Sequence, residues 1–298
     1  MPKGEKEIRR RIRSVRSTQQ ITRAMKMVAS AKLKKSQSAT EKAQPYALSM
    51  VRIIDHLVRA LPGYDHPLLR QPEKEERDGL LVVFTSDKGL CGSFNSNLVR
   101  AAESFMRGRA GWRYHLLAIG RYAIRYFLRR GYDLVDERPA YDFGIHYYDL
   151  LDIYEKIEND FLSRRFSEVW LLFSRFINPV RQLPTLLKLL PVEHEGLLAE
   201  LDAAERELTP EEEELVFSPD RWKVLDALLP RFVRYSVFNA VRETFTAENA
   251  ARMMAMDNAT KNSGEMIDNL TLQYNKARQQ AITLELLDIV GGAEALKG

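Results

Sequence analysis

The stretch from residue 252 to residue 287 constrains the fold most, because its apolar side chains recur with the spacing of a coiled coil. The predicted inward positions are Ile267, Leu270, Tyr274, Ala277, Ala281 and Leu284. Their steps alternate between three and four residues, and the average of about 3.5 is the period at which one helix packs along another. Because two of these positions are alanine, we expect the partner helix to approach closely.

The C-terminal helix is predicted to be unusually long. No proline occurs between Arg231 and Gly298, and a helix from Arg231 to Val290 would extend about 90 Å at ~1.5 Å per residue. We expect it to begin at Arg221, to bend at Pro230 and to end at Gly291–Gly292. Such a length exceeds that of ordinary globular helices and favours a mechanical or scaffolding role over an active site.

A second long helix is predicted near the N-terminus, from Lys3 to Leu61, where Pro62–Gly63 provides a stop signal. Pro45 is expected to disturb it, because proline removes a helical hydrogen bond. Its apolar stripe begins at Ile8, Ile12 and Val15. After a shift near Gln19 and Gln20, the stripe is expected to continue through Ile21, Met25, Val28 and Ala29.

Between these helices the pattern changes to alternating strands and helices. Apolar runs predict strands at 80–86, 115–119 and 169–173, with a possible fourth at 185–190. Helices are predicted at 98–107, 121–130 and 148–162. This alternation predicts a Rossmann-like α/β domain with a mostly parallel sheet.

The fold class is therefore α/β with long helices. Because a long isolated helix is marginally stable, the two terminal helices are expected to pair as an antiparallel coiled coil, with the α/β domain inserted between them. The predicted segments are an N-terminal coiled-coil helix (1–61), the α/β domain (78–191), an acidic connector (193–220) and a C-terminal coiled-coil helix (221–298).

Charge is distributed unevenly along the chain. Residues 1–35 carry a net charge of +10, whereas residues 193–220 carry −10. Blocks of this kind mark either surfaces that meet an oppositely charged partner or solvated faces. The basic block leaves open a helical nucleic-acid-binding protein, although it has few aromatic residues for base stacking.

The segment 85–97 (TSDKGLCGSFNSN) follows the first strand and leads into a helix, where a phosphate-binding loop would lie. It matches neither common phosphate-binding glycine motif. The plainer interpretation is a tight turn permitted by Gly89 and Gly92, with Asn95 or Asn97 capping the helix. An α/β enzyme using this loop stays an alternative. Cys91 is the single cysteine, and it is interpreted as a packing residue.

No apolar run is long enough to predict a membrane span, and the basic N-terminus lacks the apolar core of a secretory signal. The histidines show no metal-ligand spacing, and no acidic pair has a recognisable catalytic frame. A single cysteine excludes an internal disulfide and favours a reducing compartment.

Three segments together resemble the gamma subunit of F-type ATP synthases. They are IRRRIRSVRSTQQITRAMKMVASAKLKK at 8–35, TSDKGLCGSFNSNL at 85–98, and ENAARMMAMDNATKNSGEMIDNLTLQYNKARQQAITLELLDIVGGAEA at 248–295. They occur in the family's order and at about its usual spacing. No inserted cysteine pair is present, so the resemblance is to the bacterial-like members and not to the redox-switched plastid form.

The resemblance implies a central-stalk rotor subunit that transmits rotation of the membrane c ring to the catalytic alpha/beta hexamer, coupling ion flow to ATP synthesis. The implied partners are three alpha and three beta subunits, the epsilon subunit and the c-subunit ring, with no nucleic acid. The chain itself would be non-catalytic, with no catalytic, cofactor-binding or metal-binding residue. It would lie peripherally at the cytoplasmic face of the bacterial plasma membrane, held there through the c ring.

The resemblance also implies roles for two groups of residues. Arg278, Gln279 and Thr283 match the positions of a hydrogen-bonding catch to a beta-subunit loop. Met25, Lys26 and Arg252 match positions near the acidic lever loop of the beta subunit. We expect Arg278, Gln279 and Thr283 to lie just outside the coiled-coil seam, where they would face whatever surrounds the helices.

Overall fold

The computed structural model describes residues 3–73, 77–142, 144–193, 218 and 220–295. The chain divides into two compact units. Unit 1 consists of Met1–Ala29 with Arg252–Gly298, and unit 2 consists of Ser30–Ala251. The predicted connector at 193–220 falls almost entirely outside the described residues. The four-segment division made from the sequence stays a prediction.

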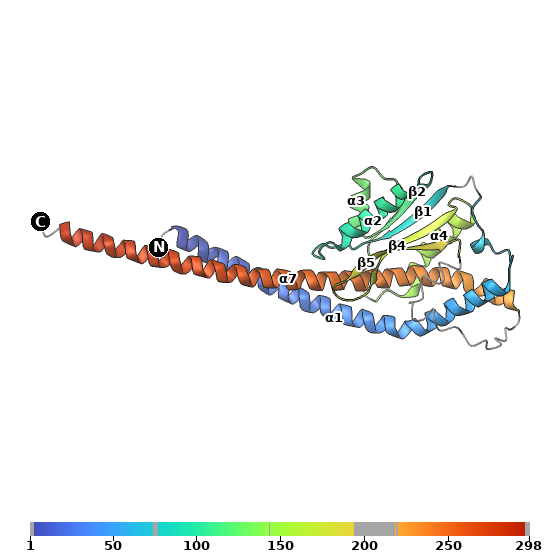
Figure 1. The fold of residues 1–298 in the computed structure, drawn as a ribbon, viewed down its shortest axis with the longest axis horizontal. Helices are drawn as coiled ribbons and strands as arrows, with labels where there is room; N and C mark the ends of the chain where they lie inside the picture. Colours follow the sequence, from blue (N-terminus) through green and yellow to red (C-terminus); the bar gives the residue numbers. More distant parts are fainter. Residues whose placement is uncertain (1–2, 74–76, 143, 194–217, 219, 296–298) are drawn as a thin grey trace. The chain divides into compact units, whose positions relative to one another are not determined.

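Both terminal helices are present, as predicted. Helix α1 spans Lys3–Ala60 and helix α7 spans Arg221–Ala295 (Figure 1). Pro45 and Pro230 lie inside these helices without ending them. The predicted end at Gly291–Gly292 is wrong, because α7 continues to Ala295. A glycine costs a helix only about 1 kcal/mol relative to alanine, so two glycines weaken a helix without terminating it.

The α/β domain in unit 2 contains a five-stranded sheet. The strands are β1 (Asp78–Phe84), β2 (Arg113–Ile119), β3 (Leu134–Arg138), β4 (Glu168–Phe176) and β5 (Gln182–Leu190). Their order is β3-β2-β1-β4-β5. The pairs β1/β2, β1/β4 and β2/β3 are parallel, whereas β5 is antiparallel to β4. The predicted, mostly parallel α/β fold is confirmed.

Strand β3 was not predicted, because its sequence LVDER is largely polar and only part of it is shielded at the sheet edge. The predicted helices correspond to α2 (Phe94–Gly108), α3 (Arg121–Leu128) and α4 (Leu151–Leu162). Short helical turns, η1 (Pro67–Leu69) and η2 (Tyr147–Leu150), lie in the connections.

Two apolar cores cover the two faces of the sheet. Alternate side chains of β1 face opposite sides, as expected for a strand. Leu80, Val82 and Phe84 join a core formed with α4, the end of α1 and the start of α7. Leu81 and Val83 join a second core, formed with α2 and α3. Figure 1 shows these two helices beside each other. The sheet is therefore buried on both faces, as a parallel sheet requires.

Candidate partner-binding surface and strand-end loop

In unit 1 the two terminal helices pair in antiparallel fashion, as predicted. The hydroxyl of Tyr274 donates a hydrogen bond to Glu5 at 3.0 Å. Further along α1, the hydroxyls of Thr22 and Thr260 lie 2.8 Å apart. Residue numbers therefore rise along one helix as they fall along the other.

The seam on α1 keeps one unbroken heptad register. Its buried and half-buried positions include Glu5, Ile8, Ile12, Val15, Gln19, Thr22, Lys26 and Ala29. The predicted shift near Gln19 and Gln20 is therefore wrong. Ile21 and Val28, which were expected to continue the stripe, are 57% and 59% exposed. Gln19 and Thr22 occupy the seam instead because each finds a hydrogen-bond partner across it.

The seam on α7 begins earlier than the apolar pattern indicated. Met256, Thr260 and Ser263 are buried or half-buried and continue the same spacing backwards from Ile267. Two of these three are polar, so a search for apolar residues passes over them. Extending the three-and-four spacing backwards would have found all three.

At its other end the predicted seam is shortened by one position. Ile267, Leu270, Tyr274, Ala277 and Ala281 are half-buried, whereas Leu284 is 62% exposed. Tyr274 already meets Glu5, close to the start of the described part of α1. Leu284 lies about 15 Å further along α7 at ~1.5 Å per residue, beyond the part of α1 that could cover it.

A polar layer crosses the middle of the seam. Besides the Thr22–Thr260 contact, the side-chain amide of Gln19 reaches the backbone carbonyl of Thr260 at 3.5 Å. A Cβ atom added to Gly264 would lie 3.2 Å from the Gln19 amide nitrogen. The glycine at 264 therefore leaves room for the Gln19 amide at this layer.

Lys26, assigned from the resemblance to the lever contact, is joined to the partner helix. Its ammonium group lies 2.6 Å from the Asp257 carboxylate, and Lys261 lies 3.1 Å from the other oxygen of that carboxylate. Hydrogen bonding from Lys26, then from Lys261, lowers the pKa of Asp257 below its ordinary value. Since two cations share one carboxylate, the cluster keeps a net positive charge. The neighbouring Met25 is half-buried, as is Arg252.

The three residues assigned to the catch are all exposed on α7. The hydroxyl of Thr283 donates to the backbone carbonyl of Gln279 at 2.9 Å, which leaves its lone pairs available to a donor from outside. Within the described residues, no carboxylate forms an ion pair with Arg278. This surface therefore presents a guanidinium, an amide and a hydroxyl oxygen to a partner.

Apolar side chains accompany these polar groups on the outside of unit 1. Near the end of α7, exposures between 48% and 63% are found for Ile282, Leu286, Leu287, Ile289 and Val290. On α1, Met27 is 62% exposed beside Val28. Clusters of exposed apolar residues mark surfaces that bind another molecule.

In the loop that follows β1, called here the strand-end loop, polar side chains form hydrogen bonds with other groups of the same chain. The Asn95 side chain accepts from the backbone N–H of Ser86 at 3.0 Å and donates to the Ser86 hydroxyl at 2.7 Å. Cys91 is buried against the same pair. Asn95 therefore joins the end of β1 to α2, and the predicted helix cap at Asn95 or Asn97 is wrong, since the helix N-cap is Ser93 and no side chain caps it.

The turn itself partly follows the prediction. Gly92 adopts a positive φ of 59°, as expected for a glycine in a tight turn, but the second left-handed residue is Leu90, with a φ of 63°. Leu90 is also 62% exposed.

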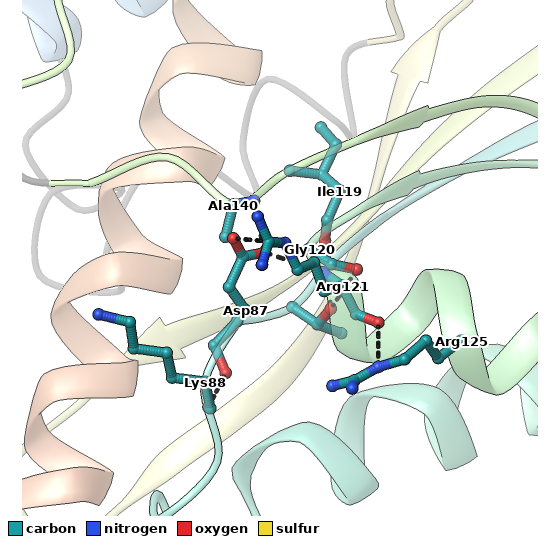
Figure 2. A network of polar contacts seen from close by, with 9 residues as sticks. Asp87, Lys88, Ile119, Gly120, Arg121, Arg125 and Ala140 are labelled. Carbon is teal, nitrogen blue, oxygen red and sulfur yellow. Dashed lines mark hydrogen bonds and ion pairs between the residues drawn. The ribbon is translucent and has the colours of Figure 1, made fainter.

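Asp87 connects this loop by hydrogen bonds to the start of α3 and to the segment after β3 (Figure 2). Its carboxylate accepts from the backbone N–H of Arg121 at 2.9 Å and from that of Ala140 at 2.8 Å. The Arg121 side chain lies 3.6 Å from the other oxygen. Asp87 thus lies at the N-terminus of α3 and joins that helix to the end of β1, so its carboxylate is held within the chain and the geometry favours a structural loop.

Known proteins agree with this arrangement. A family model described as ATP synthase matches residues 4–296. The ATP synthase gamma chain of Desulforamulus reducens is 42% identical, over 98% of this chain and 99% of the relative. That of Syntrophus aciditrophicus is 40% identical, over 98% of each chain.

The chain belongs to the ATP synthase gamma-chain family.

Solved structures of the family share the fold. A central stalk and c-ring structure of the Tetrahymena thermophila mitochondrial ATP synthase contains a chain that is 25% identical, with a TM-score of 0.57, over 80% of this chain and 99% of that one. A chain of the Euglena gracilis mitochondrial ATP synthase is 20% identical with a TM-score of 0.69, over 98% of this chain and 94% of that one. The family assignment and the fold class predicted from the sequence are confirmed.

The described residues contain no group of three or more His, Cys, Asp or Glu residues placed to hold a metal ion. None of the described helices combines the length and apolarity needed to cross a membrane.

Proposed function

We propose that this chain is the rotating central shaft of an F-type ATP synthase and transmits rotation of a c ring to an alpha/beta hexamer. The observation that carries the proposal is family membership across residues 4–296, combined with paired terminal helices whose outer faces are rich in exposed cations and apolar side chains. Coupling ion flow to ATP synthesis follows from that role.

The chain works in this proposal as a subunit of an enzyme complex and performs no chemistry itself. The strand-end loop supports this, because the side chains of Asp87 and Asn95 form hydrogen bonds with the chain's own backbone and hydroxyl groups. The catalytic work belongs to the alpha and beta subunits, and the shaft supplies asymmetry and motion.

We infer two contacts with the beta subunits. Arg278, Gln279 and Thr283 form a catch, in which the exposed guanidinium binds a carboxylate and the amide and hydroxyl complete a small hydrogen-bonding set. Met25, Lys26 and Arg252 lie at the acidic lever. Lys26 already forms an ion pair with Asp257, so its charge is divided between Asp257 and the acidic lever loop. The charge therefore attracts the lever loop without fixing it in one position.

The remaining partners are the epsilon subunit and the c ring, with the whole assembly held peripherally at the cytoplasmic face of a bacterial plasma membrane. The sequence alternative, a basic nucleic-acid-binding protein, predicts binding that weakens steeply with salt. Addition of duplex DNA to the purified chain at about 50 and 200 mM salt distinguishes the two functions.

Reconstitution tests the proposal. Purified alpha and beta subunits are mixed with and without this chain, and ATPase activity and rotation of a bead fixed to the α/β domain are recorded. We expect rotation and sustained ATPase activity only in mixtures that contain the chain. Full activity and unchanged assembly without it would overturn the shaft function.

The catch is tested in the same system with Arg278→Ala. Charge-assisted hydrogen bonds contribute about 1.5–3 kcal/mol, so we expect ATPase activity to fall roughly ten- to a hundredfold, at 1.4 kcal/mol per factor of ten. Lys276→Ala removes an exposed cation from the same helix and serves as the matched control. Equal turnover of both variants and the wild type would refute the catch assignment alone.

A further inference from the structure

The start of α7 is packed into unit 2 mainly through apolar side chains. Leu225, Leu229, Val233 and Val237 are fully buried in the core that they share with the sheet. They recur every four residues, so one face of the helix is buried. Apolar burial is non-directional. It resists separation of α7 from the domain, but it opposes sliding or twisting of the helix along that face much less.

One ion pair between α7 and α4 has the directional geometry that the apolar contacts lack. The Arg234 guanidinium donates to both oxygens of Glu158 on α4, at 3.0 and 2.9 Å. The Glu158 side chain is 13% exposed and that of Arg234 is 33% exposed. Two parallel bonds between planar groups fix orientation as well as distance. This pair therefore sets the rotational position of α7 against α4.

Two further hydrogen bonds hold α7 at other levels. The Glu243 carboxylate accepts from the backbone N–H of Phe176, at the end of β4, at 2.8 Å. The Tyr64 hydroxyl donates to Asp226 at 2.8 Å. From residue 226 to residue 243 the helix advances about 25 Å at ~1.5 Å per residue. The three contacts thus fasten a long section of α7 to three different parts of unit 2.

We propose that the Arg234–Glu158 pair, supported by Glu243 and Asp226, is the joint through which the α/β domain passes torque to α7. This inference rests on the proposed shaft function and adds the residues that perform it inside the subunit. Under load, a helix held only by apolar packing slips in register, whereas a helix held by the bidentate pair turns with the domain. Arg234 and Glu158 are positioning residues in this scheme, since neither touches a nucleotide.

The test compares variants in the complete ATP synthase, reconstituted in vesicles. Arg234→Met combined with Glu158→Leu removes the pair without leaving a buried charge unpaired. Arg231→Met, which alters an exposed arginine one turn away on the same helix, is the matched control. Each complex is assayed for ATP hydrolysis and for ions pumped per ATP hydrolysed, with and without an ionophore that removes the load.

We expect the double variant to hydrolyse ATP normally with the ionophore and to pump at least twofold fewer ions per ATP without it. The swapped pair, Arg234→Glu with Glu158→Arg, should recover much of the pumping ratio. A merely structural role would change the melting temperature and both assays together, without dependence on load.

An unchanged pumping ratio in the double variant, in a preparation whose wild-type complex pumps normally, would overturn the joint and leave the shaft function standing. Failure of the wild-type complex to pump or rotate would instead count against the shaft function. A double variant that does not assemble is replaced by Glu158→Gln, which keeps the side chain's size. An unchanged ratio in that variant overturns the joint equally.

Discussion

The two units of the chain bury very different residues. In unit 2, side chains such as Leu57, Leu80 and Val82 have no exposed surface, and two apolar cores enclose the sheet. In the described part of unit 1, the buried apolar residues are only Ile12, Ala29 and Met256, and they are matched by three buried polar residues, Glu5, Thr22 and Ser263.

This difference indicates how each unit is stabilised. Unit 2 resembles an ordinary domain, which folds on its own apolar burial. Unit 1 buries little apolar surface between its helices and leaves large side chains such as Ile21, Leu272 and Leu286 exposed. A helical pair of this kind gains stability from whatever surrounds it, as expected of a shaft within a ring.

The largest effect is expected from a cavity in unit 2. Leu57→Ala removes a fully buried side chain near the end of α1 and should lower the free energy of unfolding by about 2–5 kcal/mol. Urea unfolding followed by tryptophan fluorescence measures it, because all three tryptophans lie in unit 2. Leu272→Ala, at a 69% exposed position of unit 1, is the control. Equal losses in both variants would contradict the contrast between the units.

The next effect concerns the buried polar network of the strand-end loop. Asn95→Ala leaves the Ser86 N–H and hydroxyl without the partner that they now share, and should cost about 1–3 kcal/mol. Asn97→Ala, two residues further along α2, removes hydrogen bonds only to the exposed side chains of Ser93 and Arg100 and should change stability by less than about 0.5 kcal/mol. Thermal unfolding of the two variants separates these outcomes, and an equal, small change in both would show that the network contributes nothing.

Much of unit 2 could be predicted because its strands are marked by runs of buried apolar residues. β1 and β4 follow this rule, whereas β3 does not. Its sequence LVDER lies at the sheet edge and is only partly shielded, so no apolar run marks it. The Asn95 network could not be predicted either, since the pairing of Asn95 with Ser86 depends on how the loop folds back on β1.

In unit 1 the period was predictable but the identity of several seam residues was not. Ile267 to Ala281 were found from their spacing, because apolar residues keep it there. Around Thr22 and Thr260 the same spacing is filled by polar residues that satisfy one another, and following apolar residues led instead to Ile21 and Val28. The exposure of the catch residues followed directly from their positions between the seam steps. Their binding partner cannot be read from an isolated chain.

The polar layer itself provides the third test. Replacing both Thr22 and Thr260 by valine keeps shape and removes two mutually hydrogen-bonded hydroxyls together, which is near-neutral or stabilising for such pairs. We expect unit 1 to gain up to about 1 kcal/mol, and its helical register to become less specific, because a polar seam position selects one alignment. Hydrogen exchange of the unit 1 amides measures the gain.

Register is followed by disulfide formation between cysteines introduced at Glu5 and Tyr274. In the wild-type background one pairing should dominate, whereas the valine pair should also allow cysteines one heptad away to cross-link. A valine pair that loses stability and keeps a single register would mean that the threonine hydrogen bond stabilises the seam and does not select its alignment.

The smallest effect comes from the charge cluster of Lys26, Asp257 and Lys261 at the seam, and it depends on pH. Bonding to Lys26 and Lys261 lowers the pKa of Asp257 in the folded chain, so its contribution is present above the ordinary value of 3.8 and is lost as the pH falls through the lower, folded value. Asp257→Asn should therefore be less stable than the wild type near neutral pH, and the difference should vanish in acid. Circular dichroism melting at about pH 6, 4 and 2.5 follows it, with Asp268→Asn as the exposed control. Salt should shrink the difference at neutral pH, because exposed ion pairs are screened. A difference that persists in acid would assign the effect of Asp257 to packing and not to its charge.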